Sequence, residues 1–348
     1  MRILIPLKKE QSVENNPFVD VLSDGLANFG HEVICSREEF WENYAQYDLI
    51  FFQWPDWVLL DEHISNKDIK PLCAHLKNIR DKDIPLVITV HNLHPHDNNP
   101  FINEIYETLY SNVDAFHHMG KFSHDFLKSI YPNKYHFIVP HPIYYDLNDI
   151  TLSRKDCKKR FNLPIRKPTI LAFGAFRNKD ERKLFISLSH HFYFHAIFWA
   201  PKFNRFKEKR CFLSKLLNRL RFRLHGIKMY RGPINDTDVQ QMIQASDIMF
   251  IQRLEILNSG NLPLGFAGGN IVVGPDLGNV GEMLRATGNP VFDPHDKESI
   301  FIAVDKAISM LKQNNYSQGK KNYEYAKNHW NKEHVAQVLN DKLLTLLK

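Results

Sequence analysis

Short apolar runs alternate with longer amphipathic segments along nearly the whole chain. The apolar runs have the length of buried strands, and the amphipathic segments repeat their apolar residues with the period of a helix. In the first half, strands are predicted at Arg2–Pro6, His31–Cys35, Asp48–Phe52, Leu86–Val90, Ala115–His118 and Tyr135–Val139, with helices near 17–29, 64–80, 100–111 and 121–131. In the second half, strands are predicted at Thr169–Phe173, Phe194–Trp199, Ile227–Tyr230, Ile248–Ile251, Ile271–Val273 and Pro290–Phe292, with helices near 180–189, 210–223, 236–245, 259–268, 279–286 and 297–313. This alternation indicates an α/β protein with parallel sheets that helices cover on both faces.

The alternation pauses once, between residues 140 and 166, where prolines border the polar stretch Asn148–Lys159. A chain of 348 residues is long for a single domain. We therefore expect two doubly wound parallel-sheet domains, 1–145 and 166–315, joined by a linker at 146–165 and followed by a long helical pattern within 316–348. Ligands of open α/β sheets bind beyond the carboxyl ends of the strands. With two such sheets facing each other, we expect the site in a central cleft between them.

Composition narrows the class of protein. No apolar run reaches 18 residues, so no transmembrane helix is expected, and the first residues lack a signal-peptide pattern. The four cysteines are far apart and form no CxxC pair, which favours a reducing compartment such as the cytoplasm. The 18 histidines do not cluster at metal-ligand spacing. A structural metal site is therefore not expected.

Positive charge is concentrated in one segment of a chain whose net charge is +6: residues 202–231 contain eleven Lys or Arg and one acid, Glu208. Within it, Phe212, Leu216 and Leu220 can form one apolar face of a helix over 210–223. The basic residues expected to flank that face are Lys215, Arg219, Arg221 and Arg223. Such a helix suits an anionic membrane surface, and it suits equally a crossover helix that packs on its own sheet. No recognised nucleic-acid-binding motif accompanies the charge, so nucleic acid is not an expected partner.

The loop from Glu255 to Leu262 is the most informative segment for chemistry. It stands between an apolar strand and a predicted helix, and it carries Glu255, Asn258, Ser259, Gly260 and Asn261. A helix N-terminus presents unpaired amides and partial positive charge, so it can hold a phosphate group. Ser259 or Asn258 can cap the helix, Gly260 lets a ligand approach the backbone, and Glu255 can accept hydrogen bonds from sugar hydroxyls. An ordinary capped helix of an α/β unit explains the same pattern.

Two further loops follow predicted strands. His91 is the first residue past the strand Leu86–Val90, where an imidazole can donate to a substrate hydroxyl or act as a base, and Asp97 is the only carboxylate of that loop. In the second loop, Gly174 precedes Arg177 and Lys179, which suits a pyrophosphate because Arg grips phosphate oxygens in two places and Lys adds a point charge. Neither loop has a GxGxxG or P-loop pattern, and either can be an ordinary surface loop.

Taken together, these segments resemble nucleotide-sugar-dependent glycosyltransferases with two Rossmann-like domains, the GT-B fold, and most closely the bacterial enzymes of surface and capsular polysaccharide synthesis. The resemblance covers nearly the whole chain and rests on Met1–Pro6, on Asn16 to Val33, on Thr89–Leu93, on Val139–Tyr144, on Phe173 to Arg177, and on Asp247 to Glu282 with Ser259, Gly260 and Gly269. It implies transfer of a sugar, of hexose type, from a nucleotide diphosphate donor to a glycan on a lipid carrier, at the inner face of the plasma membrane.

The resemblance also implies roles for the two domains and for single residues. The N-terminal domain would bind the acceptor, the C-terminal domain the donor, and the last helix would cross back onto the N-terminal domain. His91 matches the histidine after the fourth strand, while Glu255, Asn258, Ser259 and Gly260 match the donor loop and Arg177 matches approximately. No metal or other cofactor is implied, because cationic side chains and amides can offset the diphosphate charge.

The chain departs from that family at three points. The loop Leu7–Asn16 has no glycine, Ala175 stands where the family has an arginine, and the second of two glutamates expected around the donor loop falls at about Leu264. These departures leave retention or inversion at the anomeric carbon open; His91 or Asp97 would be the base of an inverting enzyme. They also leave two alternatives, a catalytically inactive partner subunit of the same fold and a sugar-nucleotide epimerase.

Overall fold

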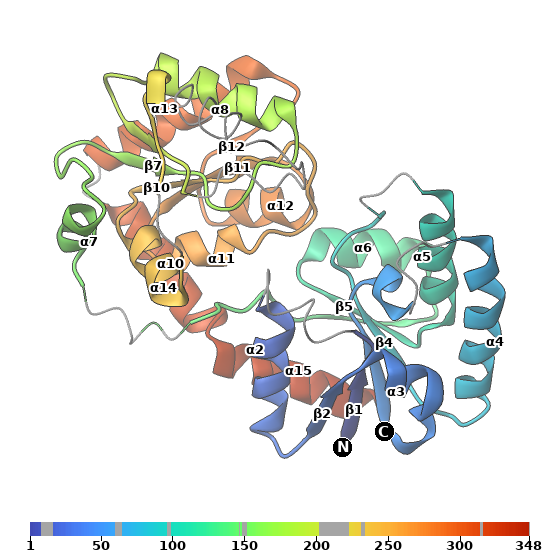
Figure 1. Cartoon of the computed structure of the whole chain (residues 1–348). Helices are drawn as coiled ribbons and strands as arrows, with labels where there is room; N and C mark the ends of the chain where they lie inside the picture. Colours follow the sequence, from blue (N-terminus) through green and yellow to red (C-terminus); the bar gives the residue numbers. More distant parts are fainter. Residues whose placement is uncertain are drawn as a thin grey trace. The chain divides into compact units, whose positions relative to one another are not determined.

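A computed structural model describes residues 1–7, 17–59, 65–95, 99–145, 147, 152–201, 223–230, 234–313 and 316–347. The chain divides into two compact units (Figure 1). The first unit contains Met1–Tyr144 and His329–Lys348, and the second contains Tyr145–Asn328. Four of the predicted functional residues lie outside the described residues, namely Asp97, Lys215, Arg219 and Arg221.

The described part of the first unit forms one parallel sheet of six strands in the order β2-β1-β3-β4-β5-β6. The strands are β1 (Arg2–Ile5), β2 (Glu32–Cys35), β3 (Leu49–Phe52), β4 (Leu86–Thr89), β5 (Ala115–His118) and β6 (Tyr135–Ile138). The helices are α2 (Phe18–Ala27), α3 (Arg37–Glu42), α4 (Ile69–Arg80), α5 (Pro100–Asn112), α6 (Lys121–Ile130) and α15 (Lys332–Leu346), with 3-10 turns at Tyr44–Gln46, Pro55–Val58 and Asn66–Asp68.

The central strands β3, β4 and β5 are buried along their whole length, as expected for strands that helices cover on both faces. The C-terminal helix α15 packs on α2 and adds Val335, Leu339 and Leu343 to the core of this unit. Gly25 permits that contact, because a Cβ atom there would lie only 2.6 Å from the Cβ of Ala336. Helices α2 and α15 therefore share one core.

The described part of the second unit also forms a parallel sheet of six strands, in the order β12-β11-β10-β7-β8-β9. The strands are β7 (Thr169–Leu171), β8 (Ile197–Trp199), β9 (Ile227–Lys228), β10 (Ile248–Phe250), β11 (Ile271–Pro275) and β12 (Val291–Phe292). The helices are α7 (Arg154–Arg160), α8 (Lys179–His191), α10 (Asp236–Gln244), α11 (Asn261–Ala267), α12 (Gly278–Ala286), α13 (Lys297–Gln313) and α14 (Ser317–His329). Two doubly wound, Rossmann-like units are therefore present, as the sequence predicts.

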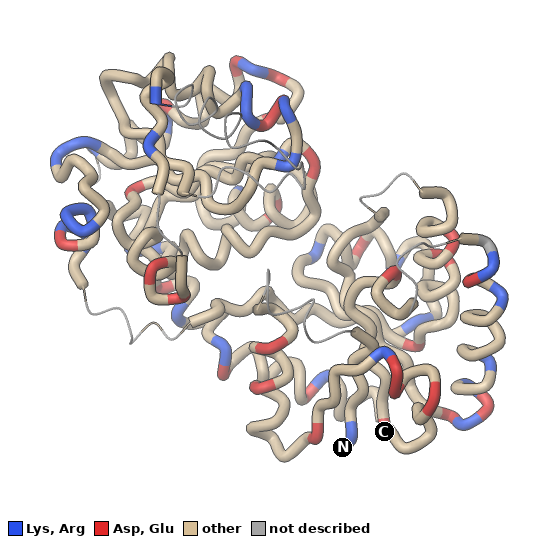
Figure 2. Tube along the Cα trace, in the orientation of Figure 1, with Lys and Arg blue, Asp and Glu red and all other residues tan. Residues whose placement is uncertain are grey.

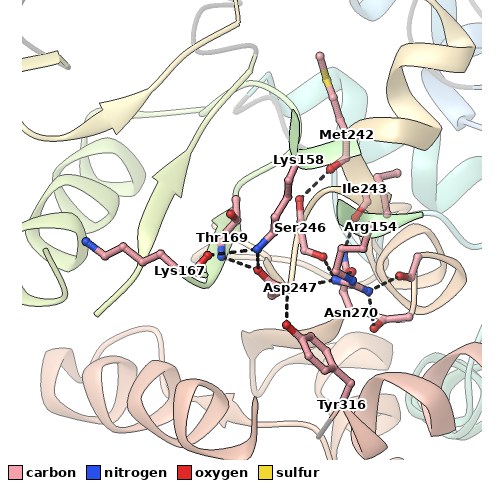
Figure 3. Close-up of polar contacts among 12 residues, drawn as sticks. Arg154, Lys158, Lys167, Thr169, Met242, Ile243, Ser246, Asp247, Asn270 and Tyr316 are labelled. Carbon is pink, nitrogen blue, oxygen red and sulfur yellow. Dashed lines mark hydrogen bonds and ion pairs between the residues drawn. The ribbon is translucent and has the colours of Figure 1, made fainter. Parts of the chain in front are cut away.

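A buried charge network fastens α7 to the amino-terminal edge of the second sheet (Figure 3). Asp247 is fully buried; its carboxylate lies 2.6 Å from Lys158 Nζ and accepts hydrogen bonds from the Thr169 amide and the Tyr316 hydroxyl. Arg154 lies 3.6 Å from Asp247 and donates to the carbonyls of Gly268 and Gly269. Helix α7 falls within 146–165, the range for which the sequence predicts a linker, and it packs as part of the second unit.

Two local features differ from the sequence prediction. The end of the chain forms two helices, α14 and α15, rather than one, because Trp330 is buried and the side chain of Asn331 accepts a hydrogen bond from the His334 amide and so starts a new helix. Helix α3 was not predicted; the Ser36 hydroxyl caps it by accepting from the Glu39 amide at 3.1 Å. No helix within the described ranges is long and apolar enough to cross a membrane.

Candidate functional site

The topology of the second sheet points to one edge. From β7 the chain runs outward to β8 and β9, and it then returns to place β10 on the other side of β7. This reversal makes a topological switch point between β7 and β10, where ligands of open α/β sheets bind beyond the carboxyl ends of the strands. The loop after β7 contains Gly174 and Arg177, and the loop after β10 contains Arg253 and Ser259. The two loops singled out in the sequence of this half therefore lie at the switch point.

Two arginines share one buried carboxylate there. Glu181, only 2% exposed, accepts a hydrogen bond from Arg253 Nη1 at 2.8 Å and another from the Arg177 backbone amide at 2.6 Å. Partial desolvation lowers the pKa of the Arg177 guanidinium; repulsion by Arg253 lowers it further, and attraction to Glu181 opposes both. One carboxylate cannot balance two guanidinium charges. The pair therefore carries a surplus positive charge that suits an anion.

The backbone at the end of β7 is open toward the same edge. Gly174 has φ +87°, in the region that favours glycine, and a Cβ atom built there would meet nothing within 4 Å. Beside it, the buried Gln252 donates through Nε2 to the carbonyls of Phe173 at 3.2 Å and Gly174 at 3.5 Å. These two carbonyls fix the amide orientation, and Oε1 of Gln252 then has no hydrogen-bond partner among the residues that the structure describes. A buried acceptor of this kind suits a donor group of a ligand.

The start of α11 is tied to the end of β7. The Asn261 side chain donates to the Phe173 carbonyl at 2.8 Å, and the Asn261 amide donates to the Ser259 hydroxyl at 3.3 Å. Gly260 has the helical dihedrals φ −61° and ψ −20°, and its role in letting a ligand approach the backbone stays a prediction. Within the described residues, the amides of Ser259 and Gly260 donate to no other protein group. These two amides remain available to an anion.

The rest of this loop is held by the start of α12. Asn258 accepts a hydrogen bond from the Asn279 side chain at 2.8 Å, and the Asn279 amide donates to the Leu257 carbonyl at 3.0 Å. Gly278 has φ +56°, and a Cβ atom there would lie 2.8 Å from Leu257 Cα. Glu255 is exposed. Asn258 therefore shapes the loop, while Glu255 stays accessible to a ligand.

Lys179 is exposed and begins α8. The cap of that helix is already satisfied, because the Asn178 side chain accepts from the amides of Asp180 and Glu181 at 3.0 and 2.9 Å. Lys179 can contribute its charge, but the amides at the start of α8 are occupied. In the second unit, then, Arg177, Lys179 and the residues from Glu255 to Asn261 lie on loops that leave the same edge of the sheet.

The first unit has its own switch point between β1 and β3. Gln53 directly follows β3, and its Oε1 atom lies 3.1 Å from Nε2 of His91, beyond the end of the neighbouring strand β4. The ring of His91 stacks on Trp54, with ring centroids 4.0 Å apart, and meets the edge of Phe18 at 4.9 Å. His91 is therefore positioned by aromatic packing as well as by hydrogen bonding.

This packing sets the protonation of His91. Desolvation lowers its pKa well below 6.5, and His117 and His141 lower it further. The imidazole is therefore neutral at pH 7 and can exchange hydrogen bonds with a hydroxyl, but a strongly lowered pKa makes it a weak general base. Asp97, the other predicted base, lies outside the described residues.

No group of three or more His, Cys, Asp or Glu side chains that could hold a metal ion occurs within the described residues.

Comparison with known proteins places the fold. No protein-family model matches the sequence, and no curated protein matches it significantly. Anabaena HepE, solved in complex with UDP, matches with a TM-score of 0.73 and 12% identity over 99% of this chain and 100% of that one; its complex with UDP-glucose gives 0.71 and 11% over 99% of both chains. The chain has the GT-B fold. Sucrose-phosphate synthase from Thermosynechococcus elongatus matches with a TM-score of 0.72 and 12% identity over 99% of this chain and 98% of that one. A glycosyltransferase from Rickettsia africae matches with 0.65 and 12% over 100% and 98%.

Sequence reasoning missed four residues of the candidate site: Gln53, Glu181, Gln252 and Arg253. A positional signal was available for three of them, since Gln53, Gln252 and Arg253 stand one to three residues past a buried strand. The burial of Glu181 had no such signal, because it depends on an ion pair between residues 72 positions apart.

Proposed function

We propose that the chain is a glycosyltransferase that moves a sugar, of hexose type, from a nucleotide diphosphate donor to a glycan acceptor. The donor would bind at the switch point of the second unit, and the acceptor would use the first unit. The solved complexes of HepE with UDP and UDP-glucose support a nucleotide sugar as the ligand of this fold.

One observation carries the proposal. Glu181 pairs with the Arg253 guanidinium and accepts from the Arg177 amide, at the edge where Gly174 opens the backbone. There the amides of Ser259 and Gly260 have no acceptor among the described residues. A diphosphate is a compact dianion that can be held by guanidinium groups and backbone amides at once. Glu255, exposed on the same loop, would accept hydrogen bonds from hydroxyls of the donor.

The proposed chemistry follows from where charge develops. During transfer, the bond between the anomeric carbon and a diphosphate oxygen breaks, an acceptor hydroxyl oxygen bonds to that carbon, and its proton leaves to a base. Negative charge grows on the departing diphosphate, so Arg177, Lys179 and the two amides would stabilise the transition state more than the ground state. This set of groups would offset the charge without a metal ion.

The neutral imidazole of His91 would position a sugar hydroxyl rather than act as a strong base. For an inverting reaction, Asp97 would then be the better candidate base. A retaining reaction would depend on stabilisation of the leaving group alone. Analysis of the product's anomeric configuration decides between these two cases.

For the acceptor, we propose a lipid-linked glycan in surface polysaccharide synthesis, used by a cytoplasmic protein bound to the inner face of the plasma membrane. The basic sequence around 210–223 supports a contact with anionic lipid. Of its four predicted membrane-facing residues, Arg223 lies within the described residues and is exposed.

The test is incubation of the purified protein with a panel of uridine, guanosine and cytidine diphosphate sugars and matched lipid-linked acceptors. Transfer with one donor supports the proposal, and neither transfer nor donor hydrolysis with any pair contradicts it. Absence of nucleotide and nucleotide-sugar binding in calorimetry would instead support the inactive partner subunit. Interconversion of two donors without an acceptor would support the epimerase.

A further inference from the structure

Two large apolar side chains protrude from the second unit at one edge of its sheet. Phe194, in the turn between α8 and β8, and Leu224, just before β9, are each 84% exposed. Tyr193, which is 55% exposed, stands next to Phe194, with ring centroids 5.2 Å apart. Isolated exposed apolar residues are common, but two that are almost fully exposed on adjoining turns are not.

The two turns belong to one surface, here called the aromatic tip and defined as Tyr193, Phe194 and Leu224. The Ser189 hydroxyl donates to the His225 carbonyl at 3.0 Å, and the rings of His190 and His225 lie 4.6 Å apart. Gly226 packs against the Tyr193 ring, since a Cβ atom there would lie 3.0 Å from that ring. The residues around Leu224 are thus fixed onto the end of α8 and onto Tyr193.

Cations surround the aromatic tip. Lys167 donates to the Tyr193 carbonyl at 2.6 Å, and its ammonium group lies 5.6 Å from the Tyr193 ring centroid. Arg166 and Arg223, next in sequence to Lys167 and Leu224, are exposed. Residues 152–167 contain seven Lys or Arg and one acid, Asp156. Arg154 and Lys158 belong to the buried network of Asp247, and four of the others, Lys155, Lys159, Arg160 and Arg166, are exposed. Figure 2 shows this basic charge along α7 and the loop before β7.

We propose that the aromatic tip is a docking surface for a bilayer rich in anionic lipid, with Phe194 and Leu224 inserting among the acyl chains and Arg166, Lys167 and Arg223 meeting the headgroups. Apolar side chains that protrude within a basic rim suit a lipid interface. The sequence that leads into Leu224, residues 202–223, is itself cationic. The inference rests on the proposed lipid-linked acceptor and assigns the surface that reaches it.

Vesicle co-sedimentation tests the proposal with the full chain. The protein is expected to bind phosphatidylglycerol vesicles, to bind neutral phosphatidylcholine vesicles weakly, and to lose binding as salt rises. The double variant F194S/L224S should reduce affinity for the anionic vesicles about tenfold or more, because each side chain loses its apolar insertion. The matched control is L344S, which removes an exposed leucine of α15 in the other unit and should leave vesicle binding unchanged.

Three outcomes would overturn the inference. The wild-type chain could fail to bind anionic vesicles, or the double variant could bind them as well as the wild type does. The third outcome is that the double variant and the wild type differ in oligomeric state in the absence of lipid. Nucleotide-sugar binding in the same samples separates this inference from the proposed function. A double variant that binds the nucleotide sugar normally but does not bind vesicles supports the docking surface. If the wild-type protein binds no nucleotide sugar, that result counts against the enzyme assignment alone.

Discussion

Glu181 accepts a hydrogen bond from Arg253 at 2.8 Å while only 2% of its side chain is exposed, and Arg253 itself is 14% exposed. A buried ion pair is costly to assemble, because both charges leave water. Here the carboxylate also accepts from the Arg177 amide, which draws the loop after β7 toward the loop after β10. The pair therefore joins two loops across the switch point, and the Arg177 guanidinium forms no ion pair with a carboxylate of the described residues.

Glu255 and Ser259 should be needed for donor binding but not for stability. E255Q removes an exposed carboxylate that would accept hydrogen bonds from hydroxyls of the donor sugar. It should weaken nucleotide-sugar affinity about tenfold. S259A removes a hydroxyl that holds the Asn261 amide, and it should weaken affinity about threefold. Calorimetric titration measures both. E298Q, on the exposed start of α13, is the control; unchanged donor affinity in both site variants would show that the loop is misassigned.

Gly278 should not tolerate a side chain. G278A puts a Cβ atom 2.8 Å from Leu257 Cα on a backbone with φ +56°, so the loop that carries Asn258 has to move. We expect a loss of about 1–3 kcal/mol in the free energy of unfolding, together with weaker donor binding. Urea denaturation and titration with nucleotide measure the two effects.

The control is G30A. Gly30 has φ +78° with nothing near its Cβ position, so this variant isolates the cost of the backbone conformation. Equal effects of G278A and G30A on donor binding would contradict the role of Gly278 in shaping the donor loop.

Asp247 should be a major contributor to the stability of the second unit. D247N leaves Lys158, which is 3% exposed, without its charge partner, so the free energy of unfolding should fall by about 3–5 kcal/mol. Urea denaturation followed by circular dichroism checks this value. D180N breaks a surface pair with Lys183 and should change stability by less than about 0.5 kcal/mol. A loss in D247N no larger than that in D180N would show that the network of Figure 3 is not a stabilising unit.

The first unit should be sensitive to acid. Burial lowers the pKa of His117 from 6.5 to about 4, although the hydrogen bond between its Nε2 and the Val139 carbonyl opposes this change. Above pH 6.5 the imidazole is neutral in both folded and unfolded chains. Between pH 6.5 and 4 the unfolded chain binds a proton that the folded chain does not. The free energy of unfolding therefore falls as the pH is lowered, by a total of about 3 kcal/mol for this residue.

The measurement is the free energy of unfolding from pH 8 to 4 in wild type, H117Q and H334Q. H117Q should have a shallower decline between pH 6.5 and 4, whereas H334Q, at an exposed position of α15, should follow the wild type. Parallel curves for wild type and H117Q would contradict the assignment.

The fold could be predicted from the sequence because apolar runs such as Leu86–Val90 stand between segments of clear helical period. Short elements fixed by a single cap were harder. Helix α3 has six residues, and Ser36 is its N-cap. The available signal in the sequence was a serine three residues before Glu39. The break between α14 and α15 depends on the burial of Trp330, which no local pattern reveals.

The candidate site was predictable only in part. Arg177 and Ser259 were identified because they follow apolar runs and have suitable chemistry. Their two loops leave neighbouring strands because β10 pairs with β7, although β8 and β9 intervene in sequence. Periodicity gives no information about that pairing, so the ion pair of Glu181 with Arg253 could not be foreseen.

Calorimetric titration of the wild type, R177A and K183A with uridine, guanosine and cytidine diphosphates tests the central claim most directly. The wild-type chain is expected to bind at least one of these nucleotides. R177A should weaken that binding about tenfold or more, because the Arg177 guanidinium makes no ion pair with a carboxylate of the described residues. K183A removes an exposed lysine paired with Asp180 and should bind as the wild type does. No nucleotide binding by the wild type, or equal affinity of R177A and wild type, would contradict the account.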